Sequence, residues 1–348
     1  MREDAILADE RDDVGENRIL AHYGLSGLTK SRLRGIRALI ASAGLDGQDL
    51  DSYHVGFLLA PRLNAAGRLG HAKLAVEMLT DASEVRANEI AAYLEQQNRQ
   101  RQAVEKTILE QALAQAAELK ADSDECRAIV LAADGWHAGV IGIVASRIVD
   151  RFHRPTIMIA LNGDGHGQGS GRSISGFHLA RALECCGQHL ETFGGYEMAA
   201  GLKIRRENVA GFRAAINQHA TQVLQPEMLT PELRLDCEAD LHLVNATLVS
   251  DLKRLGPFGH GNRKPLICAR GVTLSGPPRR VGKTGDHLQL HVRQGKAFMK
   301  CIAFGAGELF DRLQPGMTLD LAFEPQLNEF NGRTSVELEI KDLQFVPG

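Results

Sequence analysis

The longest stretch without a helix breaker runs from His71 to Asp134, where the sequence contains neither glycine nor proline. Within it, apolar or small residues recur close to a seven-residue repeat, with one polar interruption. Asp81 followed by Glu84 resembles a capping box that would begin a helix. One helix over residues 82 to 120 would be about 58 Å long at 1.5 Å per residue. We therefore predict a connector helix between two bodies, in preference to an intermolecular coiled coil.

The length and composition of the chain are those of an ordinary globular protein. At 348 residues it is long for a single hydrophobic core, so two or three domains are expected. It is 44% hydrophobic and 24% charged and contains no low-complexity tract. The first residues lack the apolar core of a signal peptide, and no run approaches the roughly 18 apolar residues of a membrane helix. We therefore expect a cytoplasmic protein without a membrane partner, in which six cysteines without CxxC spacing are reduced and buried: Cys126, Cys185, Cys186, Cys237, Cys268 and Cys301.

The pattern of apolar residues changes twice after the predicted connector. Between residues 128 and 224, short apolar runs such as "AIVLAA" and "PTIMIA" alternate with helical patterns, which predicts an α/β domain. Its loops "DGWHAG", "GSGRS" and "FGGY" flank strand or helix ends, where open α/β sheets bind ligands. Between residues 232 and 348 the apolar period is two, with turn signals between the runs. This second part predicts an all-β unit of about five strands, the size of an OB-fold barrel that binds single-stranded nucleic acid.

The net charge of −3 hides a strong asymmetry. Eleven Lys or Arg residues lie between Lys253 and Lys300, against one acid, Asp286. This segment carries +10 and the rest of the chain −13. A basic segment on an acidic protein favours a polyanion partner over a merely solvated face. The candidate nucleic-acid contacts in it, with Phe298 as a stacking platform, are Arg279, Arg280, Lys283, His287, Lys296, Phe298 and Lys300.

Three motifs resemble phosphate or metal sites, but each has a simpler structural explanation. "VGKTG" at 281 to 285 lacks the first glycine of a P-loop, because Pro277 stands there, so a hairpin turn is predicted. "DLDSYH" at 49 to 54 has metal-ligand chemistry, but no buried strand precedes it to hold the ligands. A solvated strand edge explains a further alternating set better than a metal site does: Asp236, Glu238, Asp240 and His242.

Four arginine- and glycine-rich motifs remain, at 61 to 72, 134 to 148, 169 to 177 and 193 to 201. Arginine offers a planar fork of donors, and glycine loops at helix starts expose backbone N–H groups, so the motifs suit phosphate. Bracing or capping a helix is the alternative for the two arginines of the first motif. The candidate nucleic-acid-binding residues in these motifs are Arg62, Asn64, Arg68, His137, Ser170, Arg172, Ser173, Gly194, Gly195 and Tyr196.

Taken in this order, and followed by "LGPFGHGN" at 255 to 262, these motifs resemble the RecJ family. RecJ proteins are 5′→3′ single-strand-specific DNA exonucleases of repair and recombination in the DHH phosphoesterase superfamily. The resemblance covers nearly the whole chain and implies an α/β plus all-β fold. It implies the following division: 1–80 the C-terminal remnant of a DHH domain, 81–124 a long connector helix, 125–224 a DHH-associated α/β substrate-binding domain, and 225–348 an OB-fold-like nucleic-acid-binding domain.

The chain departs from the family pattern in two places. The Asp-His-His motif and the other metal-binding motifs are absent, and they would lie upstream of Met1. The resemblance therefore implies a portion that binds single-stranded DNA without a metal site or catalytic residues of its own. Mn²⁺ or Mg²⁺ is expected only if a separate DHH-domain chain supplies the site. The second departure is Tyr196, where the family has histidine; it either replaces a phosphate-contacting imidazole or packs into the core.

Two functions stay open on these grounds. The chain is the substrate-handling part of a RecJ-type exonuclease, either truncated or one half of a split enzyme, and inactive alone. The alternative is a non-catalytic single-strand-binding or scaffold protein derived from the same fold. A nucleotide phosphodiesterase or an editing domain is disfavoured by the OB-like C-terminal part.

Overall fold

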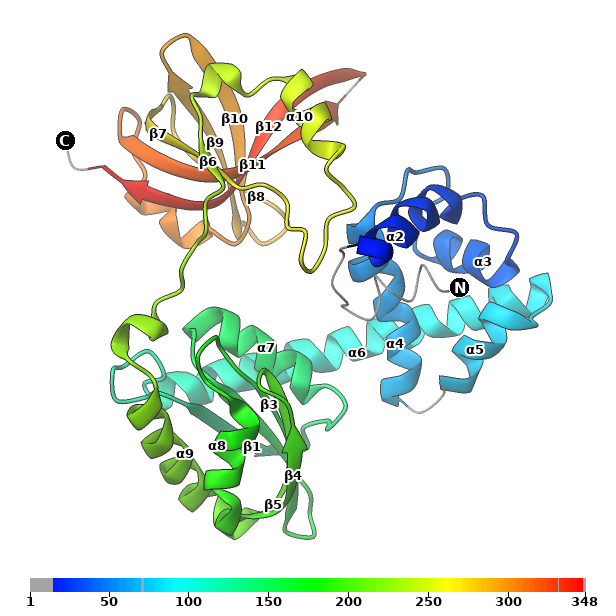
Figure 1. Ribbon diagram of the computed structural model, residues 1–348, viewed down its shortest axis with the longest axis vertical. Helices are drawn as coiled ribbons and strands as arrows, with labels where there is room; N and C mark the ends of the chain where they lie inside the picture. The colour runs from blue at the N-terminus through cyan, green and yellow to red at the C-terminus, as the bar shows by residue number, and fades with distance from the viewer. Residues whose placement is uncertain (1–14, 70–71, 331, 347–348) are drawn as a thin grey trace. The chain divides into compact units, whose positions relative to one another are not determined.

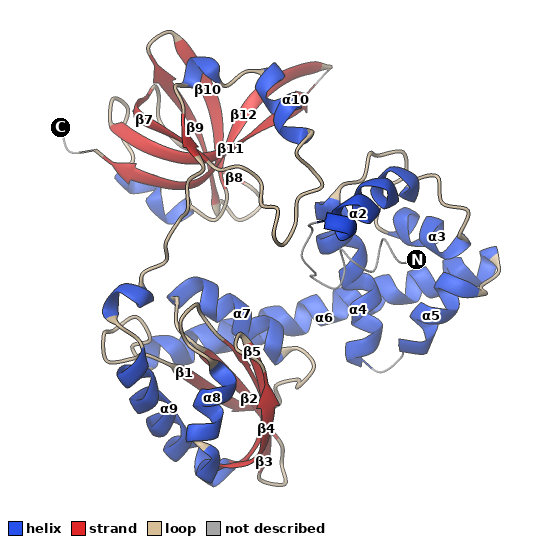
Figure 2. Cartoon of the chain, viewed as in Figure 1, coloured by secondary structure: helices blue, strands red, loops and turns tan. Residues whose placement is uncertain are grey.

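The computed structural model describes residues 15–69, 72–330 and 332–346, and Figures 1 and 2 show its helices and strands. In the described part, no helix combines the length and the apolar character needed to cross a bilayer. The α-helices are α2 (Gly15–Leu28), α3 (Arg34–Ser42), α4 (Ala60–Leu69), α5 (Ala72–Thr80), α6 (Glu84–Glu118), α7 (Ile141–Phe152), α8 (Leu179–Cys185), α9 (Val209–Val223) and α10 (Ala246–Lys253). The short helical segments are η1 (His54–Leu59), η2 (Gly187–His189), η3 (Arg206–Asn208), η4 (Pro226–Leu229), η5 (Leu241–Leu243) and η6 (Gly307–Arg312). The strands are β1 (Ile129–Asp134), β2 (Thr156–Leu161), β3 (His166–Arg172), β4 (Leu190–Gly195), β5 (Ala199–Arg205), β6 (Cys237–Glu238), β7 (Ile267–Leu274), β8 (Arg279–Val281), β9 (His287–Gln294), β10 (Ala297–Ala303), β11 (Thr318–Phe330) and β12 (Arg333–Phe345).

The chain forms two compact units, which are described separately. The first, called the α/β unit, consists of residues 31–46 and 57–232. The second, called the barrel unit, combines residues 233–348 with two earlier segments, 1–30 and 47–56. The predicted fold class, an α/β domain with a long helix followed by an all-β barrel, is confirmed.

Helix α6 is the long helix predicted from the sequence. Its 35 residues span about 52 Å. It contacts α3, α4 and α5 as well as α7 and β1, so it joins a helical part to a sheet within the α/β unit. Its N-cap is Ser83, whose hydroxyl accepts a hydrogen bond from the backbone N–H of Arg86 at 3.2 Å. The capping box expected from Asp81 and Glu84 is therefore wrong, and the cap lies two residues later than predicted.

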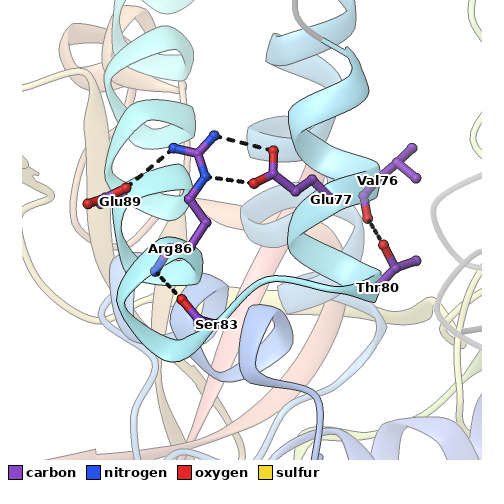
Figure 3. A network of polar contacts seen from close by, with 6 residues as sticks. All are labelled: Val76, Glu77, Thr80, Ser83, Arg86 and Glu89. Carbon is purple, nitrogen blue, oxygen red and sulfur yellow. Dashed lines mark hydrogen bonds and ion pairs between the residues drawn. The ribbon is translucent and has the colours of Figure 1, made fainter.

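Ion pairs formed by Arg86 connect helices α5 and α6 (Figure 3). The Arg86 guanidinium donates to Glu77 at 2.6 and 3.3 Å and to Glu89 at 3.3 Å. These hydrogen bonds lower the pKa of Glu77 and raise the pKa of Arg86. The ion pair between Arg86 and Glu77 therefore joins α5 to the first turn of α6, where Ser83 already caps the helix.

The sheet of the α/β unit has the strand order β1-β2-β3-β5-β4, with only the β1–β2 pair parallel. Helices α8 and α9 cover one face, and α6 and α7 cover part of the other (Figure 1). The predicted strands and helices between residues 128 and 224 are present, but β4 was expected as the tail of a helix and a loop. It pairs with β5, and all six of its residues are at least partly exposed.

Alternation along β3 decides which side chains leave the core. A Cβ at Gly167 or Gly169 would lie within 3 Å of Ile159 or Leu202 side-chain atoms, so these glycines face the core of α8 and α9. The residues between and after them therefore face the side of α7. These residues are Gln168, Ser170 and Arg172.

The barrel unit contains a closed five-stranded barrel. Its order is β7-β11-β12-β10-β9, and a β7–β9 pairing closes it. Strands β10 and β12 are parallel, and the other pairs of the barrel are antiparallel. Strands β6 and β8 extend the sheet at its edges. The expected all-β unit is thus an OB-type barrel, and "VGKTG" is the predicted hairpin turn between β8 and β9.

Two glycines of the α/β unit test the packing of its helices. A Cβ at Gly35 in α3 would lie 1.9 Å from the carbonyl oxygen of Met78, whereas one at Gly67 in α4 meets nothing within 4 Å. We expect Gly35→Ala to destabilise the unit by about 1–3 kcal/mol, because the backbone must shift. Gly67→Ala should be neutral or stabilise by up to about 1 kcal/mol, because alanine favours helix. Denaturant unfolding followed by the fluorescence of Trp136, the only tryptophan, measures both; equal midpoints would contradict the close α3–α5 contact.

Candidate nucleic-acid interface

Strand β3 meets the first turn of α7 through an arginine and a serine. Nη1 of Arg172 donates to Ser170 Oγ at 3.2 Å and to the carbonyl oxygen of Gly171 at 2.8 Å. A Cβ at Gly142 would lie 2.8 Å from Ser170 Oγ and 3.1 Å from Nη2 of Arg172. Glycine at position 142 therefore lets the guanidinium approach the helix end directly.

The start of α7 carries no side-chain cap on its own N–H groups. Nδ1 of His137 instead accepts from the N–H of Gly139 at 3.1 Å, in the loop before the helix. A helix N-terminus has partial positive charge, and Arg172 adds a full positive charge beside it. This arrangement suits a phosphate group.

The start of the loop that leads into α7 is held by two side-chain contacts. Asp134 forms a bidentate ion pair with Arg206, which lowers the pKa of the carboxyl group. Trp136 is buried, and its Nε1 donates to Gln111 of α6 at 2.7 Å. Both anchors precede His137, so they fix the start of this loop.

Beyond α7, the same face of the sheet is uncovered over β5 and β4. Ser170, Gly201 and Gly194 lie side by side across β3, β5 and β4. Thr192, Gly194, Gly201 and Lys203 are exposed, and we call them the bare face. A hollow of about 260 Å³ lies here, and Gly169, Gly194 and Gly201 are among the residues that line it. Its small residues leave room for an extended ligand beside Ser170 and Arg172.

Tyr196 follows the bare face in the turn between β4 and β5. Its backbone N–H donates to Ala199 at 2.8 Å, and its carbonyl oxygen accepts from Ala180 at 3.3 Å. The residue is 83% exposed, so the alternative in which its ring packs into the core is wrong. The preceding Gly195 has φ +149°, and a Cβ there would lie 2.4 Å from Cα of Ala200.

An aromatic pair lies on the outer face of the barrel. His291 of β9 and Phe298 of β10 are stacked, with ring centroids 5.5 Å apart and planes 19° apart. Phe298 is 58% exposed, so one of its faces is open to a ligand. The residues Arg293 and Lys300 stand opposite Phe298 and His291 in the strand register. OB folds bind oligonucleotides on this pair of strands and on the loop before it.

The basic segment is partly neutralised by acids from outside it. Lys300 pairs with Glu337 at 2.8 Å, and Arg280 approaches Asp311 at 4.0 Å and lies over Phe310. Arg254, Lys264 and Arg270 also meet acids. The cations of the segment without an ion-pair partner among the described residues are Lys253, Arg263, Arg279, Lys283, Arg293 and Lys296.

Comparisons with known proteins match both units. Residues 125–222 match the DHHA1 domain, and residues 235–342 match the RecJ OB domain. The single-stranded-DNA-specific exonuclease RecJ of Bacillus subtilis is 35% identical over 94% of this chain and 41% of its own length. The Haemophilus influenzae protein of the same name is 36% identical over 92% of this chain and 57% of its own length.

A crystal structure of RecJ from Thermus thermophilus in complex with Mg²⁺ superposes with a TM-score of 0.84 at 30% identity, covering 99% of this chain and 52% of that one. The chain is related to RecJ and carries its DHHA1 and OB domains. It spans 41–58% of the length of the curated RecJ relatives that it matches.

Two of the predicted contacts in the RecJ-like motifs are structural. Arg62 donates to the carbonyl oxygen of Leu58 at 2.5 Å and pairs with Glu95 at 2.7 Å, so it braces α4 against α6. The hydroxyl of Ser173 is buried and donates to the carbonyl oxygen of Phe177 at 2.6 Å. Both side chains therefore have partners within the fold.

The remaining predicted contacts are not brought into one cluster. Asn64 is exposed on α4, and the Arg68 side chain lies outside the described residues. Nδ1 of His287 accepts from the N–H of Gly305 at 3.1 Å. The sequence reasoning missed His291 and Phe304, whose ring stands edge-on to His287. The alternation of "HLQLHV" placed His291 on the outer face, but only the strand register brings it beside Phe298.

The weaker motifs take structural roles. Oδ1 of Asp51 accepts from the backbone N–H of His54 at 3.1 Å and lies 2.5 Å from its Nδ1, at the start of η1. Asp236 accepts from the backbone N–H of Leu266, and Glu238 pairs with Arg270. The four residues from Asp236 to His242 do not share one strand, because β6 covers only Cys237–Glu238.

All six cysteines are free thiols. Burial raises the pKa of Cys186 to about 11 and also raises that of Cys301, so both remain protonated. The prediction of buried thiols is wrong for Cys185 and Cys237, which are exposed.

The two glycines before Tyr196 should respond differently to alanine. Gly195→Ala meets both a positive φ and a backbone contact at 2.4 Å, so strain of about 1–3 kcal/mol is expected. Gly194→Ala meets nothing within 4 Å and should leave the melting temperature unchanged. Thermal unfolding followed by Trp136 fluorescence compares the two. A melting temperature lowered equally in both variants would show that the turn is not as described.

Proposed function

We propose that this chain binds single-stranded DNA as the substrate-handling portion of a RecJ-type 5′→3′ exonuclease. The observation that carries the proposal is the OB barrel, whose outer β9–β10 face combines a stacked aromatic pair with unpaired cations. Bases of any sequence stack on an aromatic ring, and cations follow the phosphate backbone. The curated relatives are named single-stranded-DNA-specific exonucleases, which supports the same class of ligand.

The barrel offers its ligand contacts in two groups. Arg279 and Lys283 lie on β8 and in the turn after it, within the connection between the first two barrel strands. Phe298, His291 and Arg293 lie on the strands themselves. We infer that phosphates follow the connection while bases stack on Phe298. Lys300 contributes less than its charge suggests, because Glu337 already neutralises it.

In the α/β unit, the proposed ligand is a phosphate of the strand. Arg172, Ser170 and the first turn of α7 supply the donors, and the bare face gives the strand room to continue. Tyr196 lies exposed at the end of that face. Its hydroxyl group can donate a hydrogen bond to a phosphate oxygen there.

Cleavage needs residues that this chain lacks. Its sequence contains no Asp-His-His motif, and in the described residues no group of three His, Cys, Asp or Glu side chains could hold a metal ion. The residues present therefore do not fit the Mg²⁺ or Mn²⁺ named with the Thermus structures. We propose that a DHH domain outside these 348 residues provides the metal site when cleavage occurs.

The barrel cations give a measurable salt dependence. Each phosphate contact on a single strand contributes a slope of about −0.7 in log K against log salt concentration. We expect the double variant Arg279→Glu/Lys283→Glu to bind a labelled oligothymidylate more weakly and with a slope shallower by about 1–2 units. Fluorescence anisotropy at several salt concentrations measures both quantities.

The control for this experiment is Lys253→Glu/Arg254→Glu, which makes the same charge change in the same basic segment. These residues lie at the end of α10, a helix that contacts β11 and β12. The control should retain the wild-type slope. A wild-type slope near zero would sink the proposal that the basic segment binds a polyanion.

The isolated chain should bind without cutting. We expect no metal-dependent nucleotide release from labelled single strands in Mn²⁺ or Mg²⁺, because the metal-binding motifs are missing. Release assays are run beside the binding assays on the same repurified sample. Hydrolysis that co-purifies with the chain, and that Asp51→Asn abolishes, would reveal a metal site in this chain and refute the proposed partner.

A further inference from the structure

The indole of Trp136 joins the loop before α7 to helix α6. Trp136 is 6% exposed, and its Nε1 donates to Oε1 of Gln111 at 2.7 Å. An indole N–H is a donor only, and a buried donor that loses its acceptor costs free energy. Gln111 is exposed on α6, so its contact with Trp136 does not follow from burial of its own side chain. The contact ties the loop to a helix that packs against other elements at both ends.

The hydrogen bond fixes what apolar packing leaves free. Trp136 belongs to the same buried cluster as Ile108 of α6 and Val140, the residue before α7. Apolar burial is not directional, whereas a hydrogen bond weakens steeply away from its preferred angle. The cluster therefore sets how deep the ring lies, and Gln111 sets the orientation of the ring within the cluster.

The backbone directly after Trp136 closes the start of α7. The carbonyl oxygen of His137 accepts from the N–H groups of Val140 at 2.9 Å and Ile141 at 3.1 Å. A change in the orientation of the indole is passed to His137, because the two residues share a planar peptide unit. The position of the first N–H groups of α7 therefore depends on how Trp136 is held.

The first turn of α7 also faces the arginine of β3. A Cβ at Gly142 would lie 2.8 Å from Ser170 Oγ and 3.1 Å from Nη2 of Arg172. Because the backbone and the guanidinium are this close, a shift of the helix start changes the distance between its N–H groups and Arg172. A phosphate held by both sets of donors would register that change.

The other anchor of the loop is of a different kind. The side chains of Asp134 and Arg206 are 63% and 46% exposed, so salt screens their ion pair. The contact between Trp136 and Gln111 joins neutral groups, one of them buried, and is not subject to this screening. At the salt concentrations of a binding assay, the hydrogen bond from α6 is the more constant of the two anchors.

We propose that Gln111 is a positioning residue for the phosphate site at β3 and α7, and that it acts through Trp136. This role rests on the phosphate site proposed above for Arg172, and Gln111 does not itself contact the phosphate. The amide oxygen of Gln111 orients the indole, the indole orients the carbonyl group of His137, and that carbonyl group sets the first turn of α7.

The test compares two glutamines of α6. Gln111→Met removes the acceptor at nearly unchanged side-chain length, and Gln111→Glu keeps an acceptor oxygen. Gln115→Met is the matched control, because Gln115 lies one turn further along α6 and its Nε2 donates to the carbonyl oxygen of Ala132 at 3.3 Å. The affinity for a short oligothymidylate is measured by fluorescence anisotropy. The parent is the full chain with Arg279→Glu/Lys283→Glu, so that the barrel contributes less.

Gln111→Met should weaken binding about two- to tenfold, the range for the loss of one hydrogen bond. Gln111→Glu and Gln115→Met should bind like the parent. In an Arg172→Ala background the effect of Gln111→Met should shrink below about twofold, because both substitutions act on the same phosphate. Parent-like binding by Gln111→Met, equal weakening by Gln115→Met, or an effect of full size without Arg172 would each overturn the proposal.

Amide hydrogen exchange of residues 137–141 reports on the loop without any ligand. Exchange there should be faster in Gln111→Met than in the parent and unchanged in Gln115→Met. The indole N–H resonance of Trp136, the only tryptophan, should move upfield in Gln111→Met as the group loses its acceptor.

The exchange data separate this role from the phosphate site itself. If Arg172→Ala leaves the affinity unchanged, the proposed phosphate site fails. Faster exchange confined to Gln111→Met would then still support Gln111 as the residue that positions the loop. Equal exchange in the two methionine variants would overturn that role, even if Arg172 binds a phosphate as proposed.

Discussion

The packing of small residues along α6 is the constraint on which the rest of the α/β unit depends. Ala87 and Ala91 are buried toward α3, α4 and α5, and Ala112 and Ala116 are buried in the cluster with α7 and β1. Most of the stability of a protein helix comes from tertiary packing, and this 35-residue helix has such contacts at both ends. Because α7 rests on α6, the position of its first turn, and with it the Arg172 site, follows from this packing.

Periodicity predicted those parts of the fold in which one face is buried. The strand β2, fully buried, and the alternating strands of the barrel were evident from their apolar pattern. The strand β4 was not, because both of its faces are exposed and only pairing with β5 makes it a strand. Its glycines therefore read as a loop. The same reason hid the bare face, which exists only once β4 lies beside β5.

The candidate site was predictable in residue type but not in role. Arg172 and Arg62 look alike in the sequence, yet Glu95, which neutralises Arg62, lies 33 positions away on another helix. Ser170 and Ser173 also look alike, and the hydroxyl of Ser173 is taken by a carbonyl four residues later. The sequence indicated the chemistry of each group, and long-range packing decided which partner each group has.

The closed barrel has a consequence for how its affinity can change. The five strands of the closed barrel are each paired on both sides, so none of these five offers a free backbone row to another chain. A ligand there would meet the outward side chains of β9, β10 and the β8 hairpin. The core is formed by other, inward side chains, such as Leu288, Leu290 and Val292 of β9. Substitutions on that outer face can therefore raise or lower binding in small steps while the fold stays intact. The barrel separates what must be kept for folding from what is free to vary for recognition.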